Sequence, residues 1–134
     1  MEKIVVASGK RKNAVAKVKL VAGNGKITFN SRPYKNLEIF QKLTLSEPVE
    51  IAKKALGKFD FDVIIRARGG GKEGQMQAAR LGLAKALVKF TESKDLKEAY
   101  LKYDRRLLVA DVRRKEAYKP GDSKARAKRQ KSYR

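Results

Sequence analysis

The segment 113–134 constrains the fold of this chain more than any other part of the sequence. It carries ten cationic side chains against two acidic ones, and it contains no Leu, Ile, Val, Phe or Met. Ordering a backbone costs roughly 1–2 kcal/mol per residue, which a segment without large aliphatic side chains cannot offset by burial. We therefore expect a globular domain over residues 1–112 and an extended basic tail over residues 113–134, which takes a fixed shape only on a polyanionic partner.

The charge of the whole chain indicates the same kind of partner. Its 134 residues carry a formal net charge of +20, which favours nucleic-acid phosphate as the counter-charge. The sequence has neither Cys nor His, which excludes disulfides, the commonest zinc sites and nucleophiles that depend on these residues. No run approaches the roughly 18 apolar residues of a membrane-spanning helix, and the apolar run near Met1 is too short for a signal peptide. We expect a cytoplasmic protein without a membrane partner.

Alternating apolar residues predict three antiparallel strands at the start of the chain, over residues 4–7, 14–21 and 26–30. Gly23-Asn24-Gly25 supplies a tight turn before the third strand. The turn from Ser8 to Asn13, between the first two strands, carries three consecutive cations. A solvated basic turn and an RNA contact both account for Lys10, Arg11 and Lys12.

Helical spacing follows from Tyr34 to Leu56, and we expect two helices there. Thr44 or Ser46 is placed to cap the second helix, Pro48 fits its first turn, and Gly57 is placed to end it. The next strand, over residues 59–68, has the cleanest alternation in the chain.

That strand directs its odd-numbered apolar residues to the core and Arg66 and Arg68 to the other face, and it runs into Gly69-Gly70-Gly71-Lys72. A long helix over residues 76–90 follows. Bare N–H groups at a helix N-terminus favour anions, so this Gly-rich turn is either an RNA-phosphate contact or a plain structural turn. It lacks the Gly-Lys-Ser/Thr ending of a Walker motif, so a nucleotide-dependent enzyme using residues 69–75 is the weaker alternative.

One face of the long helix is small at one end and cationic at the other, with Ala78, Gly82, Lys85 and Lys89. A mid-helix Gly costs about 1 kcal/mol relative to Ala, so Gly82 indicates the close approach of another helix or of RNA. A short helix over residues 95–103 and a final strand over residues 107–112 complete the expected domain.

Two carboxylates, Asp60 and Asp62, share one strand face and could in principle hold magnesium. Lys58, Arg66 and Arg68 lie near them in the sequence and favour ordinary ion pairing instead. We expect no catalytic residue, no metal, no cofactor and no small-molecule substrate. An architectural DNA-binding protein is a third interpretation, although no groove-reading helix is recognisable.

Four blocks of the sequence resemble the ninth-protein family of the small ribosomal subunit. They are residues 9–18, residues 23–26, residues 68–75 followed by 81–87, and residues 124–134, in that order. The ending Gln130-Lys131-Ser132-Tyr133-Arg134 is more similar to the archaeal and eukaryotic branch than to the bacterial one.

The resemblance implies an α+β fold like that of the second domain of ribosomal protein five, with a four-stranded mixed sheet and a left-handed βαβ crossover packed against helices. It also implies a structural constituent of the small subunit that binds ribosomal RNA in the head, beside neighbouring head proteins. The tail would then reach the anticodon stem-loop of the peptidyl-site transfer RNA, with Lys131, Ser132, Tyr133 and Arg134 as the contact positions.

The residues expected to contact ribosomal RNA are the cations and glycines of these motifs. They are Lys10, Arg11, Lys12, Arg66, Arg68, Gly69, Gly70, Gly71, Lys72, Lys85, Lys89, Arg113, Arg114, Lys124, Arg126, Lys128 and Arg129.

Overall fold

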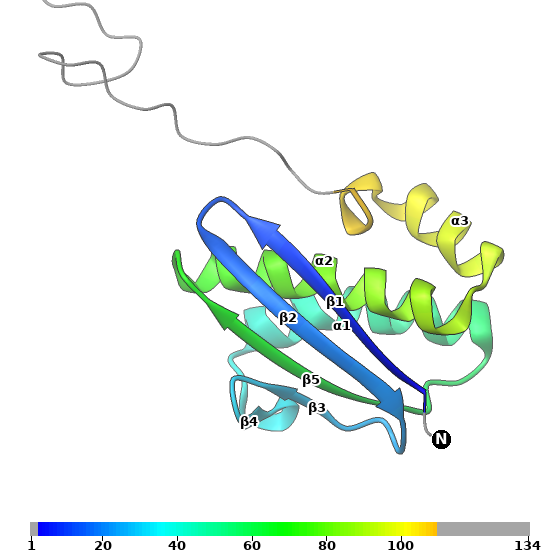
Figure 1. Ribbon diagram of the computed structural model, residues 1–134, viewed down its shortest axis with the longest axis horizontal. Coiled ribbons are helices and arrows are strands. Elements are labelled where there is room, and N and C mark those ends of the chain that lie inside the picture. The colour runs from blue at the N-terminus through cyan, green and yellow to red at the C-terminus, as the bar shows by residue number, and fades with distance from the viewer. Residues whose placement is uncertain (1–2, 110–134) are drawn as a thin grey trace, which may run out of the picture.

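A mixed sheet with helices on one side forms the domain, and the computed structural model describes residues 3–109 (Figure 1). The elements are β1 Ile4–Arg11, β2 Ala14–Ala22, β3 Ile27–Phe29, β4 Arg32–Pro33, η1 Tyr34–Asn36, α1 Ile39–Leu56, β5 Phe61–Arg68, α2 Lys72–Thr91, α3 Lys94–Tyr103 and η2 Arg105–Leu107. Here η1 and η2 are 3₁₀ turns. The expected α+β class is confirmed.

The strands lie in the order β1-β2-β5-β3-β4. Neighbouring strands are antiparallel except β3 and β5, which run parallel and are joined through α1. Two expectations are wrong. The sheet has five strands rather than four, because Arg32–Pro33 adds a short edge strand. The third strand does not pair with the second, because β5 offers β2 eight paired residues and β3 has only three.

The first two strands continue further toward their connection than expected. Lys10 pairs with Val15 and Arg11 with Ala14, so the predicted six-residue turn shrinks to Lys12 and Asn13. The cations of this segment therefore stand at the tip of a rigid antiparallel hairpin. We call residues 10–13 the hairpin tip.

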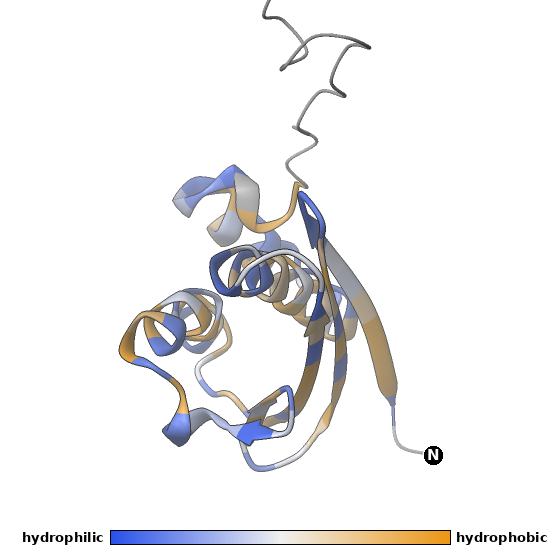
Figure 2. Ribbon diagram, turned by 90° about the vertical axis from the view of Figure 1, so that its left-hand side faces the viewer, coloured by the Kyte–Doolittle hydropathy of each residue, from blue (hydrophilic) through white to orange (hydrophobic). Residues whose placement is uncertain are grey.

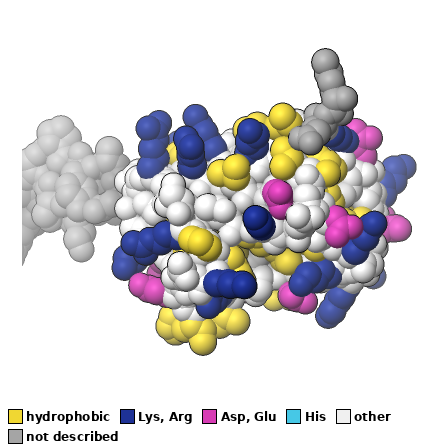
Figure 3. Space-filling view, turned by 90° about the horizontal axis from the view of Figure 1, so that it is seen from below, with side chains coloured by type: hydrophobic (Ala, Val, Ile, Leu, Met, Phe, Trp, Pro, Cys, Tyr) yellow, Lys and Arg dark blue, Asp and Glu magenta, His cyan; other side chains and the backbone are white. Residues whose placement is uncertain are grey.

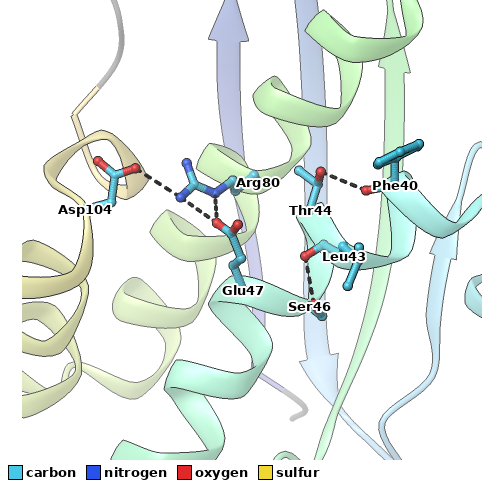
Figure 4. A network of polar contacts seen from close by, with 7 residues as sticks. All are labelled: Phe40, Leu43, Thr44, Ser46, Glu47, Arg80 and Asp104. Atoms are coloured by element: carbon cyan, nitrogen blue, oxygen red, sulfur yellow. Dashed lines mark hydrogen bonds and ion pairs between the residues drawn. The ribbon is translucent and has the colours of Figure 1, made fainter.

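The region expected to hold two helices contains a single long one, α1. A capping box between Glu38 and Gln41 starts it, and Gly57 ends it at φ 82° as predicted. Pro48 lies inside this helix. Thr44 and Ser46 do not cap a helix; their hydroxyls donate to the backbone carbonyls of Phe40 and Leu43 (Figure 4).

The expected final strand over residues 107–112 is also wrong where the structure describes it. Arg105–Leu107 form the 3₁₀ turn η2, and Leu107 is fully buried. The side chain of Leu107 therefore packs in the helical layer rather than in the sheet. Residues 110–112 lie outside the described part.

All helices of residues 3–109 cover the same face of the sheet, as Figure 2 shows from the side. β2 and β5 direct alternate residues into this layer, among them Val18, Leu20, Val63 and Ile65, which are buried. No helix from the described part of the chain covers the other face of the three long strands. We call it the open sheet face.

Helix α2 lies directly on β1, and this contact explains its mid-helix glycine. A Cβ added at Gly9 would overlap the carbonyl oxygen of Ala78 and the backbone nitrogen of Gly82. A Cβ at Gly82 would in turn press on Val18 and on the backbone of β1. Among residues 3–109, the close neighbour of Gly82 is therefore a strand rather than a second helix.

Candidate nucleic-acid interface

The hairpin tip and the Gly-rich turn, predicted separately, lie side by side around a hollow of about 560 Å³. The lining comes from the hairpin tip, from the first turns of α2 and from the residue that follows α3. The lining residues are Lys10, Arg11, Lys12, Asn13, Gly70, Gly71, Glu73, Gly74, Gln77, Arg80, Leu81 and Asp104. We call this hollow the basic hollow.

The three glycines of the turn differ in what they contact. Gly69 and Gly70 have φ of 81° and 58°, and a Cβ at Gly69 would overlap the carbonyl oxygen of Asn13. These two glycines therefore let the turn approach the hairpin tip. Gly71 has φ −100° and no heavy atom within 4 Å of an added Cβ, so the N-terminus of α2 is open to a ligand on this side.

Lys12 adopts a left-handed backbone conformation, with φ 53°. For a residue with a Cβ this conformation costs roughly 1 kcal/mol, and such strain is typical of functional positions. Lys10 and Lys12 are exposed and Arg11 is half-buried. Together with the partial positive charge at the start of α2, the hairpin tip makes the hollow attractive to an anion.

Arg80 forms one wall of the hollow and was not predicted as a site residue. Its guanidinium donates to Glu47 of α1 and to Asp104, which follows α3 (Figure 4). The signal available in the sequence is a single Arg inside an otherwise apolar stretch of α2, next to Ala79 and Leu81. Such a residue is buried only when it is paired.

Arg66 and Arg68 lie on the open sheet face, beside the hairpin rather than in the hollow. In the sheet register Arg68 is opposite Val15, and Arg66 is opposite Lys17. Lys17 and the exposed Lys19 were not predicted as site residues. Each occupies an exposed position of an alternating strand, where solvated Lys is the ordinary interpretation.

The remaining predicted helix cations lie apart from the hollow. Lys72 directs its Nζ to Glu38 Oε1 of α1, at 3.5 Å, in an exposed ion pair. Lys85 and Lys89 lie in the C-terminal half of α2, and Lys89 is roughly 25 Å along the helix from Lys72. Neither Lys85 nor Lys89 lines the basic hollow.

The predicted tail contacts lie outside the described residues. They are Arg113, Arg114, Lys124, Arg126, Lys128, Arg129, Lys131, Ser132, Tyr133 and Arg134.

The two carboxylates considered for magnesium have other partners. Asp60 pairs with Lys58 at 3.2 Å, and Asp62 Oδ1 accepts hydrogen bonds from the backbone N–H groups of Asn24 and Lys26 at 3.0 and 3.2 Å. Between residues 3 and 109, no group of three or more potential ligands gathers to hold a metal ion. None of the helices in that range has the length and apolar character needed to span a membrane.

Comparison with known proteins assigns the family. The family described as ribosomal protein S9/S16 matches residues 9–134. The chain is 47% identical to the small ribosomal subunit protein uS9 of Methanococcus vannielii, over 98% of this chain and 99% of that protein. It is 48% identical, with the same coverage, to the uS9 protein of Methanococcus maripaludis strain C5. The resemblance read from the sequence motifs is thus confirmed, and the chain belongs to the ribosomal protein S9/S16 family.

Proposed function

We propose that this chain binds ribosomal RNA in the head of the small subunit through the basic hollow, and that its tail extends the contact to the peptidyl-site transfer RNA. As a member of a ribosomal protein family, the chain is a structural constituent of the small subunit and not an enzyme. The proposal concerns what it binds there and with which residues. We also propose that the protein is located in cytoplasmic ribosomes.

The observation that carries the proposal is the meeting of the hairpin tip with the N-terminus of α2. Lys10, Arg11 and Lys12 stand opposite Gly71, where backbone N–H groups are open to a phosphate. One acidic residue of the lining, Asp104, is already bound to Arg80. The hollow therefore presents cations and backbone donors together, the combination that holds folded RNA by its phosphates.

We assign the tail to the same function because of its composition. Its cations would hold ribosomal RNA phosphates, through Arg113, Arg114, Lys124, Arg126, Lys128 and Arg129. The terminal Lys131, Ser132, Tyr133 and Arg134 would meet the anticodon stem-loop. This assignment divides the chain into a domain over residues 1–112 and a tail over residues 113–134. We also expect other proteins of the head as neighbours.

We also propose that the fold is that of the second domain of ribosomal protein five, with a left-handed crossover. The support is the arrangement of β3 and β5, which are parallel neighbours connected through α1. This is a βαβ unit, the arrangement in which a handedness is defined.

Binding of the full chain to a small-subunit head RNA at several salt concentrations tests the hollow. The variant K10Q/K12Q should lower the slope of log affinity against log salt by about 1.4–1.8, because each lost phosphate contact removes about 0.7–0.9. The matched control K54Q/K97Q removes the same charge from exposed positions on α1 and α3. Equal slopes for the two variants would remove the hairpin tip from the interface.

Truncation after Ala117 tests the tail in the same assay. This truncation removes seven cations, Lys119 and the six within the last eleven residues, so the slope should fall by about five if each contacts a phosphate as in single strands. An unchanged slope would show that the tail lies outside the RNA interface.

A further inference from the structure

We propose that the open sheet face is a second RNA-binding surface, on which Lys17, Lys19, Arg66 and Arg68 hold the sugar–phosphate backbone of folded RNA. The inference rests on the proposed function and extends it from the basic hollow to a separate surface. It assigns a role to Lys17 and Lys19, which were not predicted as site residues.

The register of the sheet places like charges next to one another. Lys17 and Arg66 are direct partners across the antiparallel β2–β5 pair, and Lys19 and Arg68 are their diagonal neighbours. Directly opposite side chains have their Cβ atoms about 5 Å apart, where like charges destabilise the sheet. An anion bound above such a pair would relieve this repulsion.

The rest of the described chain does not supply this anion. Within residues 3–109, no carboxylate forms an ion pair with Lys17, Lys19, Arg66 or Arg68. The acid nearest in the register is Asp62, which is opposite Val21 and diagonal to Lys19. Its Oδ1 accepts hydrogen bonds from the backbone N–H groups of Asn24 and Lys26 in the β2–β3 connection.

The shape and composition of this surface favour an RNA backbone over stacked bases. Adjacent strands lie about 4.8 Å apart and alternate residues about 6.6 Å apart, so the four cations form a flat, closely spaced grid. The outward-facing residues of β1, β2 and β5 include no aromatic side chain on which a base could stack. A flat cationic grid fits the phosphates that border the wide, shallow minor groove of an RNA helix.

The side chains of the open sheet face change from charged to apolar along the strands. Its other end is apolar, with Ile4, Val6 and Ile64 exposed at 55%, 57% and 45%. In Figure 3 dark-blue side chains gather along the upper margin, on the side of the sheet, and hydrophobic side chains replace them toward the N-terminal end. Lys19 lies between Val6 and Ile64, and the other three cations lie toward the hairpin tip, so one RNA could contact both the basic hollow and this grid.

The test compares the full-length variant K17Q/K19Q with the matched variant K54Q/K97Q in binding to a small-subunit head RNA over a range of salt. We expect K17Q/K19Q to weaken binding at least tenfold at moderate salt and to lower the salt slope by about 1.4–1.8. The control should stay within about twofold of the unmodified chain. Urea unfolding should show K17Q/K19Q at least as stable as the unmodified chain, because a like-charge pair is removed.

The outcomes separate this inference from the proposed function. If K17Q/K19Q binds like the control while K10Q/K12Q is impaired, the open sheet face is not an RNA surface and the basic hollow keeps its role. If the unmodified chain shows no salt-dependent binding to head RNA, the proposed function fails and the inference fails with it.

Discussion

Arg80 and Glu47 join helix α2 to helix α1 through two atoms of one guanidinium. Arg80 Nε donates to Glu47 Oε2 at 2.7 Å, and its Nη2 lies 2.6 Å from the same oxygen. Nη2 also donates to Asp104 Oδ2 at 3.1 Å, which fixes the end of α3 against α2. The Arg80 side chain is 10% exposed and the two carboxylates about 40%, so three elements meet at a nearly buried cation beside the basic hollow.

Replacing Arg80 should therefore destabilise the domain. We expect R80M to lower the free energy of unfolding by about 2 kcal/mol, because two partly buried carboxylates lose their charged donor. Urea denaturation measures this free energy of unfolding without added salt, which would screen the ion pairs. The control is K53M, which breaks an exposed ion pair with Glu50 and should change stability by less than about 0.5 kcal/mol. Equal losses in the two variants would contradict the role given to Arg80.

The strands were predictable where one face is buried and the other exposed. β2 and β5 have this character, so their period of two is visible in the sequence. The order of the strands was not predictable, because the insertion of β5 between β2 and β3 depends on contacts far apart in the chain.

The break expected within residues 34–56 shows how local signals mislead. A new helix start is predicted by Thr44 or Ser46 as an N-cap and by Pro48 in the first turn. In the structure, burial of Leu45, Pro48, Val49 and Ala52 accompanies one continuous helix. This packing offsets the hydrogen bond that Pro48 cannot donate.

The site was predictable as two separate motifs, but not as one hollow. The cations of the hairpin tip and the Gly-rich turn each stand out in the sequence. Their contact depends on Gly69 approaching the carbonyl of Asn13, which no local pattern reveals. Lys17 and Lys19 were not predicted as site residues, because their place beside Arg66 depends on a pairing of β2 with β5 that the sequence does not reveal.

The contact between β1 and α2 makes Gly9 intolerant of a side chain. We expect G9A to lower the free energy of unfolding by about 2–3 kcal/mol, because the new Cβ would overlap the backbone of α2 at Ala78 and Gly82. Thermal or urea unfolding measures the change. G71A is the control, since its Cβ meets no heavy atom within 4 Å and its φ is −100°, and it should cost less than about 1 kcal/mol. A G9A variant as stable as G71A would show that α2 does not press on β1.

Tyr100 links α3 to α1, and its contribution to stability should decrease at alkaline pH. Its hydroxyl donates to the carbonyl oxygen of Pro48 at 2.8 Å, and burial raises the pKa of Tyr100 above its ordinary value of 10.0. Y100F should cost about 1 kcal/mol at pH 8, where the hydroxyl is protonated in both states.

Because the folded-state pKa is the higher one, this contribution is complete below pH 10 and declines as the pH rises above it. The stability difference between the unmodified chain and Y100F should therefore be constant from pH 8 to about pH 9.5 and smaller near pH 11, as measured by urea unfolding. Comparing the two chains cancels the titration of the lysines. The exposed Tyr103 provides the control, since Y103F should cost less stability than Y100F at pH 8. A constant difference up to pH 11 would contradict the burial of this hydroxyl.

Asp62 lies in β5 and Asp60 directly precedes this strand, and the two carboxylates have different structural roles. Asp62 Oδ1 accepts from the backbone N–H groups of Asn24 and Lys26, so D62A leaves two donors of the β2–β3 connection without their acceptor. We expect D62A to lower the free energy of unfolding by about 1–2 kcal/mol. D60A removes only an exposed ion pair with Lys58 and should cost less than about 0.5 kcal/mol. Urea unfolding of both variants, with and without Mg²⁺, also tests the metal alternative, because a magnesium site would make both losses depend on the ion.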